Sequence, residues 1–230
     1  MLKLAIFDVD GTLVDSQGTI LAAMAAGHEA AGLAMPARET VLSIVGLSLP
    51  IAMARLHPDA PADQVEHLTQ AYKSAYKAAR DAGGGESTIP FYPGAREALA
   101  RLDEAGWLLA VATGKARRGL AHMLAAHDLE RLFVATQTAD DAPSKPHPAM
   151  IENLLSETGV APHEAVMIGD TRFDLEMAAN ARVAAVGVSW GYHPVSALFD
   201  AAPHSVIEDF SEIDAALSAA LKHGRAGAPL

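Results

Sequence analysis

Short apolar runs alternate with helix-like segments through most of the chain. Nearly continuous apolar runs occupy residues 2–7, 108–113, 132–138, 165–169 and 183–190, and a weaker one occupies residues 204–207. Such runs are typical of parallel strands that are buried on both faces. Between them, residues 95–105, 117–126, 148–158, 174–181 and 211–222 have the apolar spacing of helices. This alternation predicts an α/β fold with a Rossmann-like parallel sheet.

The segment from residue 16 to residue 82 has a different pattern. Its alanine-rich, helix-like stretches lie at residues 20–31, 38–45, 49–56 and 62–81, with prolines between them and no convincing strand. Gly83, Gly84 and Gly85 then have the composition of a flexible hinge. We therefore expect residues 16–85 to form a helical domain, inserted after the first strand of an α/β core made of residues 1–15 and 86–230.

Composition narrows the class of protein. Half of the 230 residues are hydrophobic (50%), and 17 Lys and Arg against 28 Asp and Glu give a formal net charge of −11. This charge argues against binding to nucleic acid or to an anionic membrane surface. Cys is absent, which excludes disulfides and thiolate metal sites. No apolar run approaches the roughly 18 residues of a membrane span, and residues 4–7 are too short for a signal peptide. We expect a soluble cytoplasmic protein, either monomer or homodimer.

Two carboxylates, Asp8 and Asp10, follow the first predicted strand directly. Residues i and i+2 of an extended chain point to the same side, so both carboxylates face the sheet edge at which α/β proteins bind ligands. A divalent cation would relieve their mutual repulsion. A solvated Asp-Gly turn is the alternative. A calcium loop is excluded, because Thr12 and Leu13 occupy the positions where that loop needs Asp or Asn and then Gly.

A second acidic cluster follows the buried run at residues 165–169. Asp170 stands at the end of this strand, and Asp174 lies about one helical turn further on. A helix N-cap would account for either residue alone. Two acidic clusters at strand ends nevertheless supply the hard oxygen ligands that magnesium prefers.

Two further positions could bind a phosphate. Thr113 and Gly114 follow the predicted strand at residues 108–113, where a hydroxyl and backbone N–H groups can hold an anion. Lys145 lies in a loop stiffened by prolines, which could aim its ammonium inward. The alternatives are an ordinary helix start and a solvated lysine. Thr113-Gly114-Lys115 is not the end of a P-loop, because Leu109 and Ala116 replace the residues which that motif requires.

Taken in chain order, these four sites resemble the motifs of the haloacid dehalogenase superfamily of phosphohydrolases. The segment from Asp8 to Ser16 resembles the whole first motif, Thr113 with Gly114 the second, Lys145 the third, and Gly169, Asp170 and Asp174 the fourth. The likeness spans nearly the whole chain. The helical insertion resembles the small cap of the phosphoglycolate phosphatase-like branch, subfamily IA.

The resemblance implies a role for each site residue. Asp8 is the nucleophile that forms an aspartyl-phosphate, and Asp10 is the acid and base for the leaving alcohol and the incoming water. Mg²⁺ is held by Asp8, the backbone carbonyl of Asp10, and Asp170. Phosphoryl oxygens are bound by Thr113 and Lys145, and Asp174 orients metal-bound water or Lys145. Further substrate contacts are expected from Gly11, Thr12 and Gly114 in the core, and from Gly46, Leu47 and Ser48 in a loop of the cap.

The implied activity is Mg²⁺-dependent hydrolysis of a small phosphorylated metabolite, such as a phosphoglycolate-like ester or a sugar phosphate. Thr12 and Gly169 stand where the mutase branch of the family often carries Val and Glu, which favours hydrolysis. A phosphomutase of the same fold, a regulatory binding module and a receiver-like phosphoacceptor are the alternatives. A second anionic group of the substrate could meet cap cations, for which the candidates are Arg55, Lys73 and Lys77, although such residues are commonly solvated helix charges.

Overall fold

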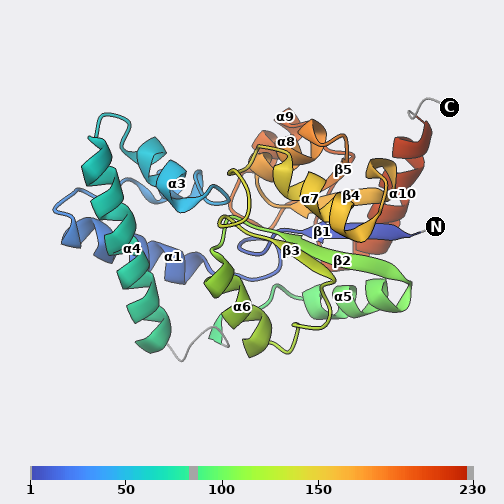
Figure 1. Cartoon of the computed structure of the whole chain (residues 1–230), viewed down its shortest axis with the longest axis horizontal. Helices are drawn as coiled ribbons and strands as arrows, with labels where there is room; N and C mark the ends of the chain where they lie inside the picture. The colour runs from blue at the N-terminus through green and yellow to red at the C-terminus, as the bar shows by residue number, and fades with distance from the viewer. Residues whose placement is uncertain (1, 83–87, 227–230) are drawn as a thin grey trace.

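The computed structural model describes residues 2–82 and 88–226, and it contains one fully parallel sheet of six strands (Figure 1). The sheet order is β3-β2-β1-β4-β5-β6. The strands are β1 (Lys3–Phe7), β2 (Trp107–Ala112), β3 (Ala135–Gln137), β4 (Ala165–Gly169), β5 (Ala184–Val188) and β6 (Ser205–Ile207). This doubly wound arrangement confirms the predicted α/β class. Its central strand β1 lies where the strand order reverses, which is the usual ligand-binding position in such sheets.

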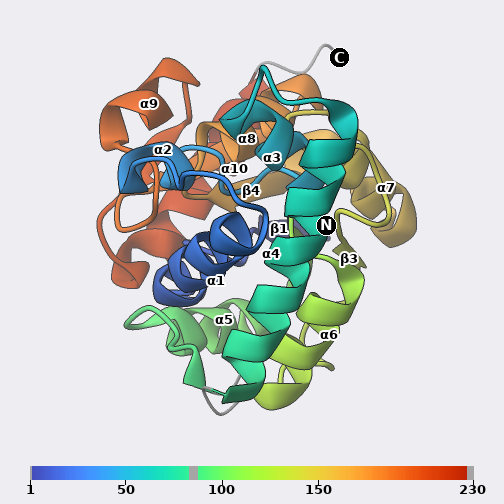
Figure 2. The same ribbon diagram turned by 90° about the vertical axis from the view of Figure 1, so that its left-hand side faces the viewer.

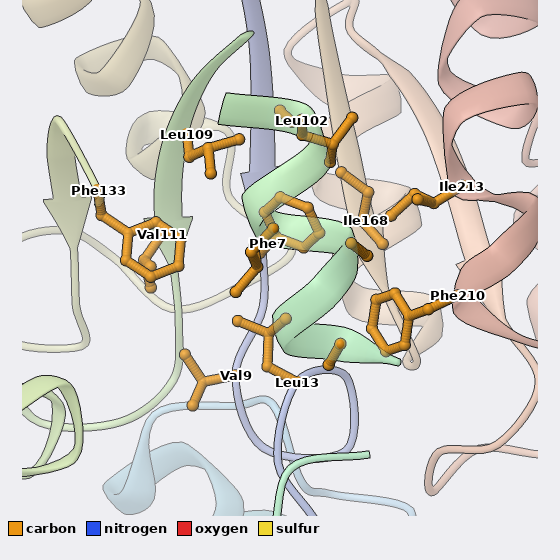
Figure 3. Packing of buried hydrophobic residues seen from close by; sticks show 14 of the residues in the cluster. Phe7, Val9, Leu13, Leu102, Leu109, Val111, Phe133, Ile168, Phe210 and Ile213 are labelled. Atoms are coloured by element: carbon orange, nitrogen blue, oxygen red, sulfur yellow. The ribbon is translucent and has the colours of Figure 1, made fainter. Parts of the chain in front are cut away.

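Helices cover both faces of the sheet. Alternate residues of β1 point to opposite faces, so each helical layer packs against a different set of β1 side chains. Ala5 and Phe7 pack in a cluster with α5 (Ala95–Glu104), α6 (Arg117–Ala126) and α10 (Ile213–Ala226). Leu4 and Ile6 pack on the other face with α7 (Ala149–Thr158), α8 (Arg172–Asn180) and α9 (Val195–Asp200). Figure 3 shows the first cluster, with Phe7 lying among residues from neighbouring strands and helices. Burial on both faces explains why the strands are almost wholly apolar.

Of the five described helices between β1 and β2, the first four stand beyond one end of the sheet (Figures 1 and 2). They are α1 (Gln17–Ala30), α2 (Arg38–Leu42), α3 (Leu49–Leu56) and α4 (Ala62–Ala82). The helices enclose a separate apolar cluster that includes Met24, Met53 and Leu68. A Cβ on Gly27 of α1 would lie 3.0 Å from the Tyr72 backbone of α4, so glycine permits the close approach of these two helices. The predicted hinge at residues 83–85 lies outside the described residues.

Some sequence predictions differ from the structure. The strand expected at residues 132–138 is only β3, because Leu132 and Phe133 pack from the preceding turn onto the core. The sequence pattern does not predict helix α9. Helix α8 begins at Arg172, before the expected residue 174. The last helix is preceded by a short 3-10 turn, Phe210–Glu212, and extends to Ala226. Among the described helices, none combines the length and the apolar character that crossing a membrane requires.

Candidate functional site

The carboxyl ends of three adjacent strands meet at the edge of the sheet that faces the inserted helices. Phe7, the last residue of β1, pairs with Val111 of β2 and Ile168 of β4. Because these strands are parallel and in register, the residues that follow them share one edge. Asp8, Thr113 and Asp170 are these residues, and each is almost completely buried. Three of the predicted site residues therefore arrive together through strand pairing alone.

A buried lysine joins two of the acidic residues. Lys145 Nζ donates to Asp8 Oδ1 at 2.8 Å and to Asp174 Oδ1 at 2.5 Å. Its side chain is 0% exposed. Burial by itself lowers the pKa of Lys145, but Asp174 and Asp8 more than reverse this effect, so the pKa lies above its usual value. Lys145 is therefore a permanent cation inside the site.

Asp174 serves the local helix and the site at once. Its Oδ2 accepts from the backbone N–H of Thr171 at 3.1 Å and from Thr171 Oγ1 at 2.6 Å, while its Oδ1 accepts from Lys145. Thr171 is the N-cap of α8, and Asp174 completes a capping box at the third helical position. The helix cap and the acidic cluster, which the sequence presents as alternatives, share one carboxylate here.

Asp170 is enclosed by backbone on two sides. Its Oδ1 accepts from Thr12 Oγ1 at 3.0 Å, and its Oδ2 accepts from the Tyr192 N–H at 2.8 Å. A Cβ on Gly11 would lie 2.2 Å from Asp170 Oδ2, and a Cβ on Gly191 would lie 2.1 Å from Asp170 Cβ. Gly11 also has a φ of 92°, which favours glycine. These two glycines let the backbone close around a fixed carboxylate.

The site has an excess of negative charge. Carboxylate oxygens of Asp8, Asp170 and Asp174 lie within 4.8 Å of one another, and Lys145 neutralises only part of their charge. Burial raises the pKa of Asp8 to about 6, against the opposing effect of Lys145. Burial, together with the charges of Asp8 and Asp174, raises the pKa of Asp170 well above its usual value. A buried set of hard oxygen donors with uncompensated charge fits a divalent cation.

Not all three carboxylates are equally suited to a cation. Both oxygens of Asp174 already accept hydrogen bonds from Lys145 or Thr171. Asp8 accepts from Lys145 through Oδ1, so its Oδ2 can face a metal. Each oxygen of Asp170 accepts only one hydrogen bond, from a neutral donor, whereas Asp174 has the Lys145 ammonium on one oxygen and two donors on the other. Asp8 and Asp170 are therefore the side chains that fit a divalent cation best, with Asp174 holding Lys145 in place.

Asp10 lies in a separate polar network on the side of the inserted helices. Its Oδ1 accepts from Ser16 Oγ at 2.6 Å, and Lys115 Nζ lies 3.0 Å from Oδ1 and 3.2 Å from Oδ2. The Tyr192 hydroxyl accepts from the Ser16 N–H at 3.1 Å and lies 3.0 Å from Ser16 Oγ. Ser16 and Lys115 thus fix the orientation of the Asp10 carboxylate.

The predicted loop at Gly46, Leu47 and Ser48 reaches the core. A Cβ on Gly114 would lie 2.6 Å from the Gly46 carbonyl oxygen, so the loop backbone rests on the turn that follows Thr113. The Ser48 N–H donates to Ser144 Oγ at 2.8 Å, next to Lys145. A Cβ on Gly46 would also lie 3.1 Å from Thr171 Oγ1. The loop therefore contacts three of the four segments that carry the site.

The cap cations considered in the sequence analysis lie elsewhere. Lys73 and Lys77 are exposed on α4. The Arg55 guanidinium lies 5.4 Å from the ring centre of Phe173 at the start of α8. The cation beside Asp10 is Lys115, for which the sequence pattern suggests no role beyond the excluded P-loop. Its position two residues after Thr113 was the available signal. The indole of Trp190 donates to the Thr12 carbonyl at 3.1 Å and packs on Phe210, so it supports the first motif from the core.

A doubly wound parallel sheet, with a buried Asp–Lys–Asp cluster at its carboxyl edge and a helical insertion above that edge, defines a class of hydrolases. The family model for haloacid dehalogenase-like hydrolases matches residues 5–188. The chain belongs to this family.

Relatives agree with this assignment. A probable phosphatase, IndB, of Dickeya dadantii is 34% identical over 96% of this chain and 96% of its own length. A phosphoglycolate phosphatase of Mannheimia succiniciproducens is 31% identical over 92% of this chain and 96% of its own length. The solved structure of a haloacid dehalogenase-like hydrolase from Streptococcus pneumoniae has a TM-score of 0.79 and 26% identity, covering 93% of this chain and 97% of that one.

Proposed function

We propose that the protein is a Mg²⁺-dependent phosphatase that hydrolyses a small phosphomonoester, a phosphoglycolate-like ester or a sugar phosphate, through an aspartyl-phosphate on Asp8. The observation that carries this proposal is the buried Lys145 between Asp8 and Asp174, beside Asp170. A lysine held on a nucleophilic carboxylate lowers the repulsion that an incoming phosphate dianion would meet. Family membership and relatives named phosphatases support the same activity.

Each side chain of the site has its own role in the proposed reaction. Asp8 attacks phosphorus, and its position at the end of β1 holds it fixed for an in-line displacement. Thr113 and Lys145 bind phosphoryl oxygens, while Asp174 keeps Lys145 in place. Asp8, Asp170 and the backbone carbonyl of Asp10 would hold Mg²⁺, which screens the charge between carboxylate and phosphate when it is bound. Thr12 and Gly11 fix Asp170.

Asp10 acts as the general acid and then as the general base. It donates to the leaving oxygen and then accepts a proton from the water that hydrolyses the aspartyl-phosphate. Ser16 and Lys115 hold its carboxylate, and Lys115 also contacts Tyr76 of the inserted helices. We further propose that residues 16–85 act as a cap, with the loop at Gly46, Leu47 and Ser48 closing over the substrate.

Phosphate release from a panel of phosphomonoesters tests this function. With Mg²⁺ present, we expect one small ester to be hydrolysed far faster than the others. EDTA should abolish the activity and added Mg²⁺ should restore it. A panel without any phosphate release in Mg²⁺ would contradict the proposed function, and activity that persists after exhaustive metal removal would contradict the metal requirement.

The metal site also predicts a pH-dependent effect on stability. Without metal, the raised pKa of Asp8, about 6 against 3.8 for the ordinary group, makes ionising it in the folded state cost about 3 kcal/mol at 1.36 kcal/mol per unit. Because the pKa of Asp8 is higher in the folded state than in the unfolded state, the folded state keeps a proton that the unfolded state has already lost. This cost is therefore absent well below pH 4, grows as the pH rises from about 4 toward 6, and is complete above it.

Mg²⁺ binds the ionised carboxylates and offsets that cost. Mg²⁺ should therefore raise the thermal midpoint of unfolding more at pH 7.5 than at pH 5, each measured against EDTA at the same pH. Because each Mg²⁺-induced shift of the thermal midpoint is measured against EDTA at the same pH, the effects of pH on all other groups cancel. The same Mg²⁺ shift at both values would show that these buried carboxyls do not bind the cation.

A further inference from the structure

The Tyr192 side chain lies where the core loop after β5 meets the inserted helices. Its ring packs in an apolar cluster with Ile20, Leu42 and Val45, all from the segment that carries those helices. The residue is 7% exposed. Its backbone N–H donates to Asp170 Oδ2 at 2.8 Å. One core residue therefore contacts both the inserted segment and a carboxylate of the site.

The hydroxyl of Tyr192 forms a chain of hydrogen bonds with Ser16 and Asp10. The Ser16 N–H donates to the Tyr192 oxygen at 3.1 Å, and the two hydroxyl oxygens lie 3.0 Å apart. Ser16 Oγ donates to Asp10 Oδ1 at 2.6 Å. Because a hydroxyl has a single proton to donate, the Tyr192 hydroxyl must be the donor to Ser16 Oγ. The chain therefore runs in one direction, from Tyr192 through Ser16 to Asp10.

The two oxygens of Asp10 receive different donors. Oδ1 accepts from Ser16 Oγ at 2.6 Å and from Lys115 Nζ at 3.0 Å. Within the part of the chain that the structure describes, Oδ2 has Lys115 Nζ alone, at 3.2 Å. Hydrogen bonds to a carboxylate oxygen favour its unprotonated form, so a proton on Asp10 is expected on Oδ2. Oδ2 is therefore the oxygen that can protonate a leaving group.

We propose that Tyr192 is a positioning residue for the general acid, because its hydroxyl acts through Ser16 to hold Oδ2 of Asp10, and the proton on it, toward the leaving oxygen. This inference rests on the proposed function, in which Asp8 attacks phosphorus. As the bond between phosphorus and the leaving oxygen breaks, its electron pair stays on that oxygen, which takes the Oδ2 proton and departs as an alcohol. Without the Tyr192 hydroxyl, the Ser16 hydroxyl can rotate away from Asp10, and the acid spends less time in the productive orientation.

Two esters of similar size but different leaving groups test this role. The ester 4-nitrophenyl phosphate releases a stable phenolate that barely needs a proton, whereas benzyl phosphate releases an alkoxide that needs one. The parameter to compare is kcat/KM in Mg²⁺, because it includes no step after the leaving group has departed. In Tyr192→Phe, kcat/KM for benzyl phosphate should fall about 10-fold more than kcat/KM for 4-nitrophenyl phosphate. This is a part of the roughly 10²- to 10⁴-fold that general acid catalysis contributes.

Further variants assign the effect to the chain of hydrogen bonds. Ser16→Ala should lower the ratio of benzyl to 4-nitrophenyl kcat/KM at least as much as Tyr192→Phe, because it removes the donor to Asp10 itself. In the Ser16→Ala background, Tyr192→Phe should change this ratio by less than about twofold, since both act through one chain. Tyr92→Phe is the matched control. It deletes a phenol hydroxyl that has no hydrogen bond to another described residue, and it should leave the ratio unchanged.

A purely structural role of Tyr192 would slow both esters alike. Equal losses on the two esters, or an unchanged ratio in Tyr192→Phe, would therefore overturn the proposal. A Tyr92→Phe control that lowers the ratio as much would overturn it as well. So would fully multiplicative effects of Ser16→Ala and Tyr192→Phe, because two independent positions do not form a chain.

Crystal structures of the wild type and of Tyr192→Phe separate this inference from the proposed function. In the variant we expect the ring to stay in its cluster and the N–H to stay on Asp170. The Ser16 hydroxyl should turn, and the Asp10 carboxylate should lose its single orientation with Oδ1 on Ser16. This result needs no turnover, so it supports the positioning role even if the wild-type protein hydrolyses no ester. An Asp10 carboxylate that keeps the wild-type orientation would overturn the role, even if the wild-type protein is an active phosphatase.

Discussion

Asp8→Asn is expected to lower phosphate release by about 10⁴-fold or more, the scale on which loss of a nucleophile acts. The amide has nearly the same shape as the carboxylate, but it cannot attack phosphorus. The substitution also removes one of three buried negative charges that lie within 4.8 Å of one another. The variant should therefore fold normally, with a thermal midpoint in EDTA no lower than that of the wild type.

Three measurements check this expectation. Steady-state phosphate release gives the loss of rate, and circular dichroism confirms the fold. Acid quenching with a substrate labelled on phosphorus should trap label on wild-type protein and none on the variant. Asp103→Asn, at an exposed position on α5, is the matched control. A folded Asp8→Asn variant that retains wild-type turnover would remove Asp8 as the nucleophile.

The sequence predicts the sheet because burial on both faces leaves a simple signal. Strand β1 and strand β4 are continuous apolar runs, and the residues after them are polar, so both their extent and their chemistry are visible. Prediction is less accurate where an apolar residue lies outside a strand or where an element is very short. Phe133 is as apolar as a strand residue, yet it reaches the core from a turn. Helix α9 has only six residues, which is too short for a helical period to stand out.

Some residues of the candidate site can likewise be predicted from the sequence, and others cannot. Asp8 and Asp170 are predictable because each follows a strand and the strands are parallel. Lys145 is buried by contacts with residues 137 and 29 positions away in the chain, and its loop position alone does not reveal this. Ser16, which orients Asp10, is itself bound by Tyr192, 176 residues away. Their meeting depends on how the inserted helices lie against the core.

The burial of histidines shows the same limit. Scattered histidines without ligand spacing suggest surface and cap positions. His127 is the C-cap of α6, although it is buried, but the interpretation is wrong for His28 and His193, which are buried within the fold. His28 Nε2 lies 2.9 Å from His57 Nε2 between α1 and the end of α3, and Arg96 donates to the His127 carbonyl at 3.1 Å. Their burial follows from tertiary contacts that have no local pattern in the sequence.

Lys145→Met is expected to lower the free energy of unfolding by about 3–5 kcal/mol in EDTA, the usual cost of breaking a buried ion pair by removing one partner. Methionine fills most of the space of the lysine stem but leaves Asp8, Asp170 and Asp174 buried without a cation. Urea unfolding gives the free energy, and Lys222→Met at an exposed site should change it by less than about 0.5 kcal/mol. A loss for Lys145→Met no larger than that of the control would show that the cluster is not held by charge.

A second substitution distinguishes lost charge from lost packing in that variant. Asp174→Asn alone should destabilise the protein, because Asp174 accepts from Lys145 and completes the capping box of α8. In the Lys145→Met background the same change removes a carboxylate that repels its neighbours, so it should cost less or even stabilise. The two effects should differ by about 0.5–3 kcal/mol, the range found for directly coupled residues. Additive losses would mean that Lys145 stabilises the fold by filling space, and the electrostatic account of the site would then lose its basis.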